Sequence, residues 1–190
     1  MLFAQKGFNA TSTRDIASKA DVNLGLIAYY FGTKKKLLQD ILQRKIGFYK
    51  DSFIVIENMN LSTIEKLNAM IDVYINHMFE NRHFHLIVNT EVHSAKSNEH
   101  KTHFNNLIYE NAQIFHRIIE NGIKKNEIRK GISYKYIMPS IIGIVSIHIQ
   151  SEQLMKKCLD IDEKNKKADN LYLENLRSYL KELLKTYLEK

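Results

Sequence analysis

The stretch TSTRDIASKADVNLGLIAYYFGTKKKLL, residues 11–38, decides the fold. It contains two short helical segments, 14–20 and 24–31, each preceded by residue types that cap helix N-termini. Asn23 is the expected cap of the second segment, and Gly32 is expected to end it. Two short helices joined by a turn of about three residues form a helix-turn-helix motif. In that motif the second helix lies in the DNA major groove.

The N-terminal sequence resembles the DNA-binding domain of the TetR family of bacterial regulators. The matching positions run without gaps from residue 2 to residue 38: LFxxxGF at 2–8, then Thr13-Arg14-Asp15-Ile16-Ala17, Val22, Gly25, Ile27, Tyr30-Phe31, Lys34 and Leu37. The resemblance implies an all-α protein with a helix-turn-helix head, residues 1–47, and a helical ligand-sensing and dimerisation domain, residues 48–190. It implies a ligand-responsive transcriptional regulator that binds a specific operator in double-stranded DNA. A repressor that a small molecule releases from the operator is the expected form.

The same resemblance implies which side chains contact the DNA backbone. Thr13, Tyr29, Tyr30 and Lys34 match positions that bond phosphates in the family. Hydroxyl and ammonium groups suit that role because they donate hydrogen bonds to phosphate oxygens.

Base contacts are expected from two helices of the head. Arg14 matches a position that reaches a guanine edge, where a guanidinium group fits O6 and N7. Leu24, Gly25 and Leu26 begin the recognition helix. Gly25 permits close approach of the backbone, and the two leucines offer contacts to thymine methyl groups but no hydrogen bonds.

Two positions and the first helix depart from the family pattern. Asp21 stands where the turn usually has glycine, and aspartate tolerates a left-handed backbone better than most residues. Ala28 stands where an aromatic residue is common. The first helix, Met1–Lys6, is shorter than family members usually have. The alternative function is therefore a helical ligand-binding or scaffold protein that has lost DNA binding through this shortened helix.

Positive charge is concentrated in the head. The first 50 residues carry nine Lys and Arg and three Asp, a net charge of +6, whereas the whole chain has a net charge of +7. The remaining 140 residues therefore contribute only +1. This distribution indicates a polyanionic partner for the N-terminal end.

Composition narrows the class of protein further. One proline and seven glycines in 190 residues favour long helices, and the single Cys158 fits a reducing cytoplasm. No apolar run is long enough to span a membrane, and no signal-peptide pattern is present. The motifs of phosphate-binding, hydrolytic and zinc enzymes are absent, so we expect no enzyme and no cofactor.

Six histidines fall within 27 positions: His77, His83, His85, His93, His100 and His103. Their spacing matches no strict metal-binding motif, and no cysteine lies among them. We therefore expect no metal site.

The remainder of the chain is predicted to be helical. A long helix, Thr33–Ile56, links the head to the second domain, and Ser62-Thr63-Ile64-Glu65 is a capping box that opens another helix. Further helices are predicted at 82–95 and 100–125. A single helix is predicted at 134–158, bent by Pro139, and Asp169 is expected to cap the last one.

The last two helices carry more apolar surface than one partner can bury. The resemblance implies that they pair with their copies in a four-helix homodimer interface; an ordinary monomer core is the alternative. The expected interface residues are Ile141, Ile144, Val145, Leu173, Leu176, Leu180, Leu183 and Tyr187.

The identity of a small-molecule effector is not encoded in any motif. Aromatic and soft side chains suited to an apolar ligand are the expected pocket residues: Tyr74, Met78, Phe84, Tyr109 and Phe115. A plain core role is the alternative for each of them.

Overall fold

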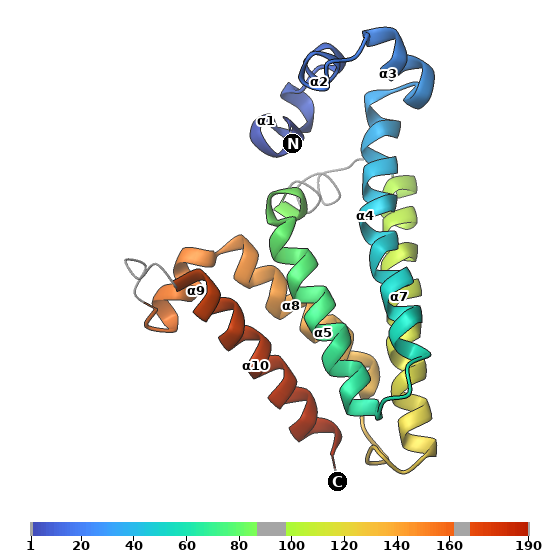
Figure 1. Ribbon diagram of the computed structural model, residues 1–190, viewed down its shortest axis with the longest axis vertical. Helices are drawn as coiled ribbons and strands as arrows, with labels where there is room; N and C mark the ends of the chain where they lie inside the picture. Colours follow the sequence, from blue (N-terminus) through green and yellow to red (C-terminus); the bar gives the residue numbers. More distant parts are fainter. Residues whose placement is uncertain (1, 87–97, 162–167, 190) are drawn as a thin grey trace. The chain divides into compact units, whose positions relative to one another are not determined.

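The computed structural model describes residues 2–86, 98–161 and 168–189 (Figure 1). Every regular element in these ranges is a helix, which confirms the all-α prediction. The chain forms two compact units: Met1–Phe48 with Asn81–Tyr109, and Tyr49–Glu80 with Glu110–Lys190. Because the first unit includes 81–109, the predicted domain division at residues 47 and 48 stays a prediction.

The first unit contains the expected helix-turn-helix. Helices α1 (Leu2–Ala10), α2 (Thr13–Lys19) and α3 (Leu24–Phe31) precede the start of α4 (Lys34–Glu57). Ser12 caps α2 through a reciprocal capping box, in which the Asp15 N–H donates to Ser12 Oγ at 3.0 Å and the Ser12 N–H donates to Asp15 Oδ2 at 2.9 Å. The Gly25 N–H donates to Asn23 Oδ1 at 2.8 Å, which confirms the predicted cap of α3.

Two backbone breaks shape this unit. Asp21 adopts a φ of 53°, so the left-handed turn between α2 and α3 forms without the usual glycine. Gly7 has φ 79° and ψ 165°, which interrupts α1 after its first turns. This break separates the helical segment before Gly7 from the rest of α1, so the position of that segment depends on contacts with the rest of the head.

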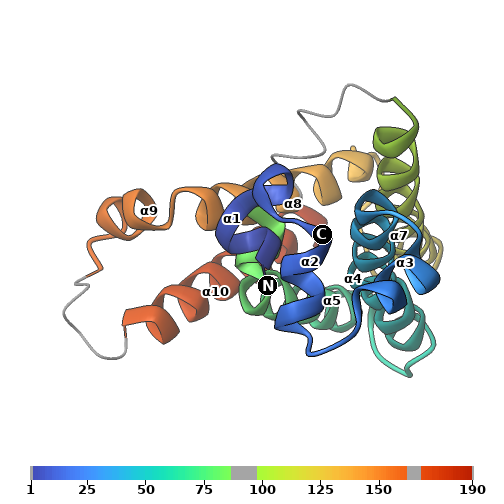
Figure 2. The ribbon, with the colours of Figure 1, turned by 90° about the horizontal axis from the view of Figure 1, so that it is seen from above.

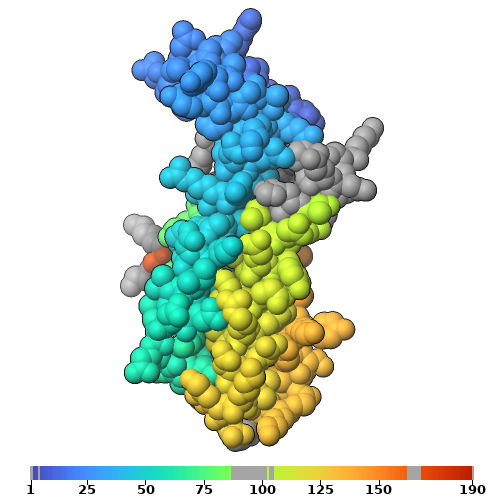
Figure 3. Space-filling view, turned by 90° about the vertical axis from the view of Figure 1, so that its right-hand side faces the viewer, coloured from blue at the N-terminus to red at the C-terminus, as the bar shows by residue number. Residues whose placement is uncertain are grey.

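The second unit is a bundle of helices around an apolar core. Helix α5 (Thr63–Glu80) packs against both α8 (Ile137–Gln150) and α10 (Ala168–Leu188) (Figure 2). The last part of α4 runs parallel to α7 (Asn98–Lys124), as Figure 3 shows. Ion pairs between Lys50 and Glu110 at 2.9 Å, and between Glu57 and Arg117 at 2.8 Å, fix this pairing.

The predicted single helix at 134–158 is wrong. A 3-10 turn, Tyr134–Tyr136, precedes α8, and Ser151 with φ −129° and ψ 43° separates α8 from α9 (Glu152–Cys158). Pro139 lies in the first turn of α8. Backbone N–H groups of a first turn have no carbonyl partner within the helix, so a proline there breaks no hydrogen bond and does not bend the helix.

The prediction that Asp169 caps the last helix is wrong. Asp169 lies inside the first turn of α10, and its carboxylate bonds Lys156 Nζ at 2.6 Å. Lys156 also pairs with Glu152 at 2.7 Å, so this nearly buried lysine ties α9 to α10.

Gly122 marks a close approach of α7 to the start of α5. A Cβ at this position would lie 2.5 Å from Thr63 Oγ1 and 2.8 Å from Ile128 Cγ1. We expect Gly122→Ala to destabilise the protein by about 1–3 kcal/mol, as overpacking usually does. Gly47→Ala is the matched control, because a Cβ there meets nothing within 4 Å and alanine favours the helix. Denaturant unfolding measures both, and an unchanged G122A midpoint would contradict the packing.

Three exposed carboxylates at helix ends have a lowered pKa. Hydrogen bonds from Ser12 lower the pKa of Asp15, those from Ser62 lower the pKa of Glu65, and those from Thr63 lower the pKa of Glu127. Each group binds a proton less readily when folded, so its contribution to stability is present above the unfolded pKa and disappears as the pH falls through the folded pKa.

We therefore expect the urea midpoint to fall as the pH is lowered from about 6 to about 3. Glu127→Gln should flatten this dependence, because the glutamine cannot take up a proton. The exposed Glu174 of α10 gives the matched control, Glu174→Gln. If the two variants had identical pH profiles, the role assigned to Glu127 would be wrong.

Candidate DNA-binding head and ligand-sensing unit

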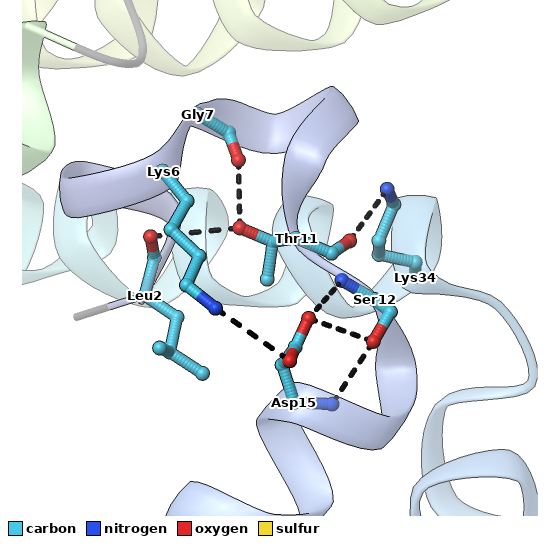
Figure 4. A network of polar contacts seen from close by, with 7 residues as sticks. All are labelled: Leu2, Lys6, Gly7, Thr11, Ser12, Asp15 and Lys34. Carbon is cyan, nitrogen blue, oxygen red and sulfur yellow. Dashed lines mark hydrogen bonds and ion pairs between the residues drawn. The ribbon is translucent and has the colours of Figure 1, made fainter.

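A network of polar contacts anchors α1 in the head (Figure 4). The fully buried Thr11 donates from Oγ1 to the Gly7 carbonyl at 2.7 Å. Lys34, the first residue of α4, donates from Nζ to the carbonyl oxygens of Phe8 at 2.7 Å and Thr11 at 2.8 Å. Its ammonium also lies 4.4 Å from the centre of the Phe8 ring. These contacts join the end of α1 to α4.

Sequence reasoning missed this role of Lys34. It assigned the side chain to a phosphate, whereas the structure directs the ammonium toward carbonyl groups at the end of α1. The end of a helix presents such carbonyls without intrahelical partners, and a cation there is favourable. The phosphate contact of Lys34 stays a prediction, with a second role beside it.

Two tyrosines of α3 point away from the core of the head. Tyr29 is 81% exposed and Tyr30 is 70% exposed, and their rings meet edge to face with centroids 5.1 Å apart. Ile27 is buried and Phe31 is half-buried, so these two residues pack α3 onto its neighbours. Because both side chains are exposed, both hydroxyl groups are available to a partner. Large aromatic side chains on a surface often mark a binding site.

The other predicted DNA contacts are also accessible. Arg14 on α2 is exposed, and Thr13 beside it is half-buried. At the start of α3, Leu24 is 39% exposed, Leu26 is 45% exposed, and Gly25 lies exposed between them. Exposure places these side chains where DNA could be reached; the contacts themselves stay predictions.

The predicted pocket residues divide into two groups. Tyr74, Met78 and Phe115 are buried in the core of the second unit. Phe84 is half-buried in the first unit, and Tyr109 is 63% exposed on α7. The role of all five residues in a ligand pocket stays a prediction.

A polar pair within the second unit was not foreseen. The buried Tyr49 hydroxyl and His77 Nδ1 form a hydrogen bond of 2.8 Å, and the Tyr49 ring lies 5.4 Å from that of Tyr74. Burial raises the pKa of both tyrosines, which keeps their hydroxyl groups protonated. A tyrosine on α4 and a histidine on α5 give no sequence signal, because only the fold brings them together.

The expected dimer residues mostly belong to the core of one chain. Ile141, Val145, Leu176 and Leu180 are buried within the second unit, and Ile144, Leu173 and Tyr187 pack partly against it. Leu183 is the member of the predicted set that lies exposed. The interface itself stays a prediction, because the 3–4 spacing identifies an apolar stripe but cannot tell which helix covers that stripe.

Another apolar face remains exposed on α8 and α10. His148 of α8 and Tyr172 of α10 share a hydrogen bond of 2.7 Å, and Ser133, which precedes α8, donates its N–H to the Tyr187 hydroxyl of α10 at 3.2 Å. These two pairs make the helices antiparallel. Several apolar side chains of these two helices are exposed or half-buried: Ile144 and Ile147 of α8, and Tyr179 and Leu183 of α10. We call these four residues the outer face.

Neither a metal site nor a membrane span is found in the part of the chain that the structure describes. No three His, Cys, Asp or Glu side chains in these residues are placed to hold a metal ion. His93 and the side chains of His100 and His103 lie outside the described residues. None of the helices described here is both long enough and apolar enough to cross a bilayer.

Comparison with known proteins agrees with the geometry at both ends of the chain. Residues 1–41 match the model of bacterial regulatory proteins of the tetR family, and residues 64–178 match the tetracyclin repressor-like C-terminal domain.

Individual relatives match over most of the chain. A probable HTH-type transcriptional regulator of Bacillus subtilis, YttP, is 25% identical over 188 residues, which cover 98% of this chain and 90% of the relative. The HTH-type transcriptional repressor KstR2 of Rhodococcus jostii is 27% identical over 134 residues, which cover 69% of this chain and 64% of the relative. The crystal structure of the transcriptional regulator FadR from Bacillus subtilis in complex with stearoyl-CoA superposes with a TM-score of 0.74, at 21% identity, over 96% of this chain and 91% of that one.

Proposed function

Because the chain belongs to the TetR family of bacterial transcriptional regulators, we propose that it binds a DNA operator through the head as a homodimer. The observation that carries this proposal is the pair of exposed tyrosines, Tyr29 and Tyr30, on a head whose first 50 residues have a net charge of +6. Neutral hydroxyl donors and surrounding cations together suit a phosphate backbone. The anchoring of α1 by Lys34 and Thr11 favours this function over the alternative of a head disabled by its short first helix.

The outer face of α8 and α10 is the surface that we assign to the homodimer. Four apolar side chains gathered on two neighbouring helices are unfavourable in water, and a twofold copy would cover them with the same residues. A dimer would then present two recognition helices to two half-sites about 34–36 Å apart. We place the protein in the bacterial cytoplasm, where its operator is.

An apolar small molecule is the proposed effector. The second unit surrounds Tyr74, Met78 and Phe115 with other apolar side chains, and the Tyr49–His77 pair supplies polar groups nearby. A ligand that binds better to a conformation with unsuitable head spacing would release the operator by a shift of population. Stearoyl-CoA is a reasonable first probe, because the relative of known structure is in complex with it. Weaker operator binding in its presence supports release, and tighter binding would indicate a corepressor.

An electrophoretic shift with the DNA that flanks the gene tests the proposed function. The wild-type protein should retard this DNA but not an unrelated duplex of the same length. Tyr29→Phe combined with Tyr30→Phe should weaken binding by about tenfold or more, since each subunit loses two hydroxyl donors. The circular dichroism spectrum should not change, because both rings remain and neither hydroxyl is buried. No retardation by the folded wild-type protein would favour the alternative of a ligand-binding protein without DNA binding.

A further inference from the structure

The chemistry of the face that α3 presents suggests how an operator is read. Ile27 and Phe31 turn inward, which leaves Gly25 and Tyr29 on the opposite side of the helix, with Leu26 and Ala28 on its two flanks. Leu24 shares the face of Ile27 and Phe31, but it stands in the first turn and is 39% exposed. Apart from the tyrosine hydroxyl groups, the side chains of α3, LGLIAYYF, contain no hydrogen-bonding group. A helix of this composition cannot make the bidentate bonds by which Arg, Asn or Gln distinguish bases.

Asn23 does not supply the missing bonds. Its Oδ1 already accepts the Gly25 N–H at 2.8 Å, which fixes the amide as the cap of α3. Recognition of adenine by an asparagine needs both its oxygen and its nitrogen. Freeing the oxygen would break this cap and destabilise α3, so the amide is committed to the fold.

We propose that the recognition helix reads A·T base pairs through the methyl groups of thymine, with Leu24 and Leu26 as the residues that determine specificity. This inference rests on the proposed function. The thymine C5-methyl is the apolar group exposed in the major groove. Burying it against a leucine removes both from water, whereas the polar edge of a G·C pair against the same leucine loses its hydrogen bonds with water. Leu24 and Leu26 therefore favour thymine and reject G·C.

The test starts from a random-sequence duplex library selected with the full-length protein. We expect the selected sites to have thymine at fixed positions in each half-site. The duplex with the highest affinity is then synthesised with deoxyuridine at one of these positions in each half-site, which removes the methyl group and keeps all base pairing. Loss of one buried methyl group is worth about fourfold, so two losses should weaken binding by about fifteenfold.

Protein variants assign the effect to the leucines. Leu26→Ala and Leu24→Ala should each bind the thymine duplex more weakly, and one of them should lose the distinction between thymine and deoxyuridine. Leu154→Ala, at an exposed leucine of α9, is the matched control and should keep that distinction in full. Selected sites without thymine, or a deoxyuridine effect below twofold in the wild-type protein, would overturn methyl recognition while leaving operator binding intact. A library that shows no enrichment would overturn both this inference and the proposed function.

Discussion

Replacing Ile147 with glutamate is expected to produce a folded monomer that binds operator DNA at least about a hundredfold more weakly. Ile147 lies exposed on the outer face of α8, so a charged side chain there has water around it in the single chain. In a twofold dimer the same substitution would bury two carboxylates without partners, which is strongly unfavourable. A monomer engages one half-site at a time and loses the gain in avidity of about 10²–10⁴ that a linked second site provides.

Sedimentation equilibrium and an operator titration measure these two effects. Val55→Glu is the matched control, because Val55 is also an exposed apolar residue but belongs to the end of α4 rather than the outer face. It should leave both the mass and the affinity unchanged. A dimeric I147E protein would show that the subunits associate through another surface. A monomeric I147E protein with undiminished affinity would show that DNA binding does not need a dimer.

The local features of the fold were predictable because their causes are local. Asn23 and the Ser62–Glu65 pair cap helices as expected, since each cap depends on residues within one helical turn. The left-handed Asp21 also followed from its own conformational preference.

Features that depend on tertiary packing were not predictable in the same way. Leu176 and Leu180 have the spacing expected of a dimer helix, but α5 of the same chain covers them. The pattern reports only that a stripe is apolar, and the fold decides whether a neighbouring helix or a second subunit covers it. For the same reason the buried pair of Tyr49 and His77, 28 residues apart, gave no signal.

Two roles are open for Lys34: it holds α1 through the carbonyl groups of Phe8 and Thr11, and it is predicted to contact a DNA phosphate. Its substitution separates these roles. We expect Lys34→Met to loosen α1, because the carbonyl groups of Phe8 and Thr11 would lose a charged donor. The expected destabilisation is about 2 kcal/mol, typical of hydrogen bonds to a charged group. Amide hydrogen exchange of residues 2–11 should therefore become faster. Operator affinity should fall because the head loses its fixed arrangement, while the dependence of log K on log salt keeps its slope.

A lysine whose main role is to contact phosphate behaves differently. Its loss reduces the salt slope by about 1 for each contact, hence by about 2 for a dimer, and leaves the exchange of α1 unchanged. Lys35→Met is the matched control, since Lys35 is the exposed neighbour on the same turn of α4 and should not affect α1. Unchanged exchange in K34M together with a smaller slope would make Lys34 a phosphate contact. Faster exchange at a constant slope would make it the residue that holds α1 in place within a DNA-binding head.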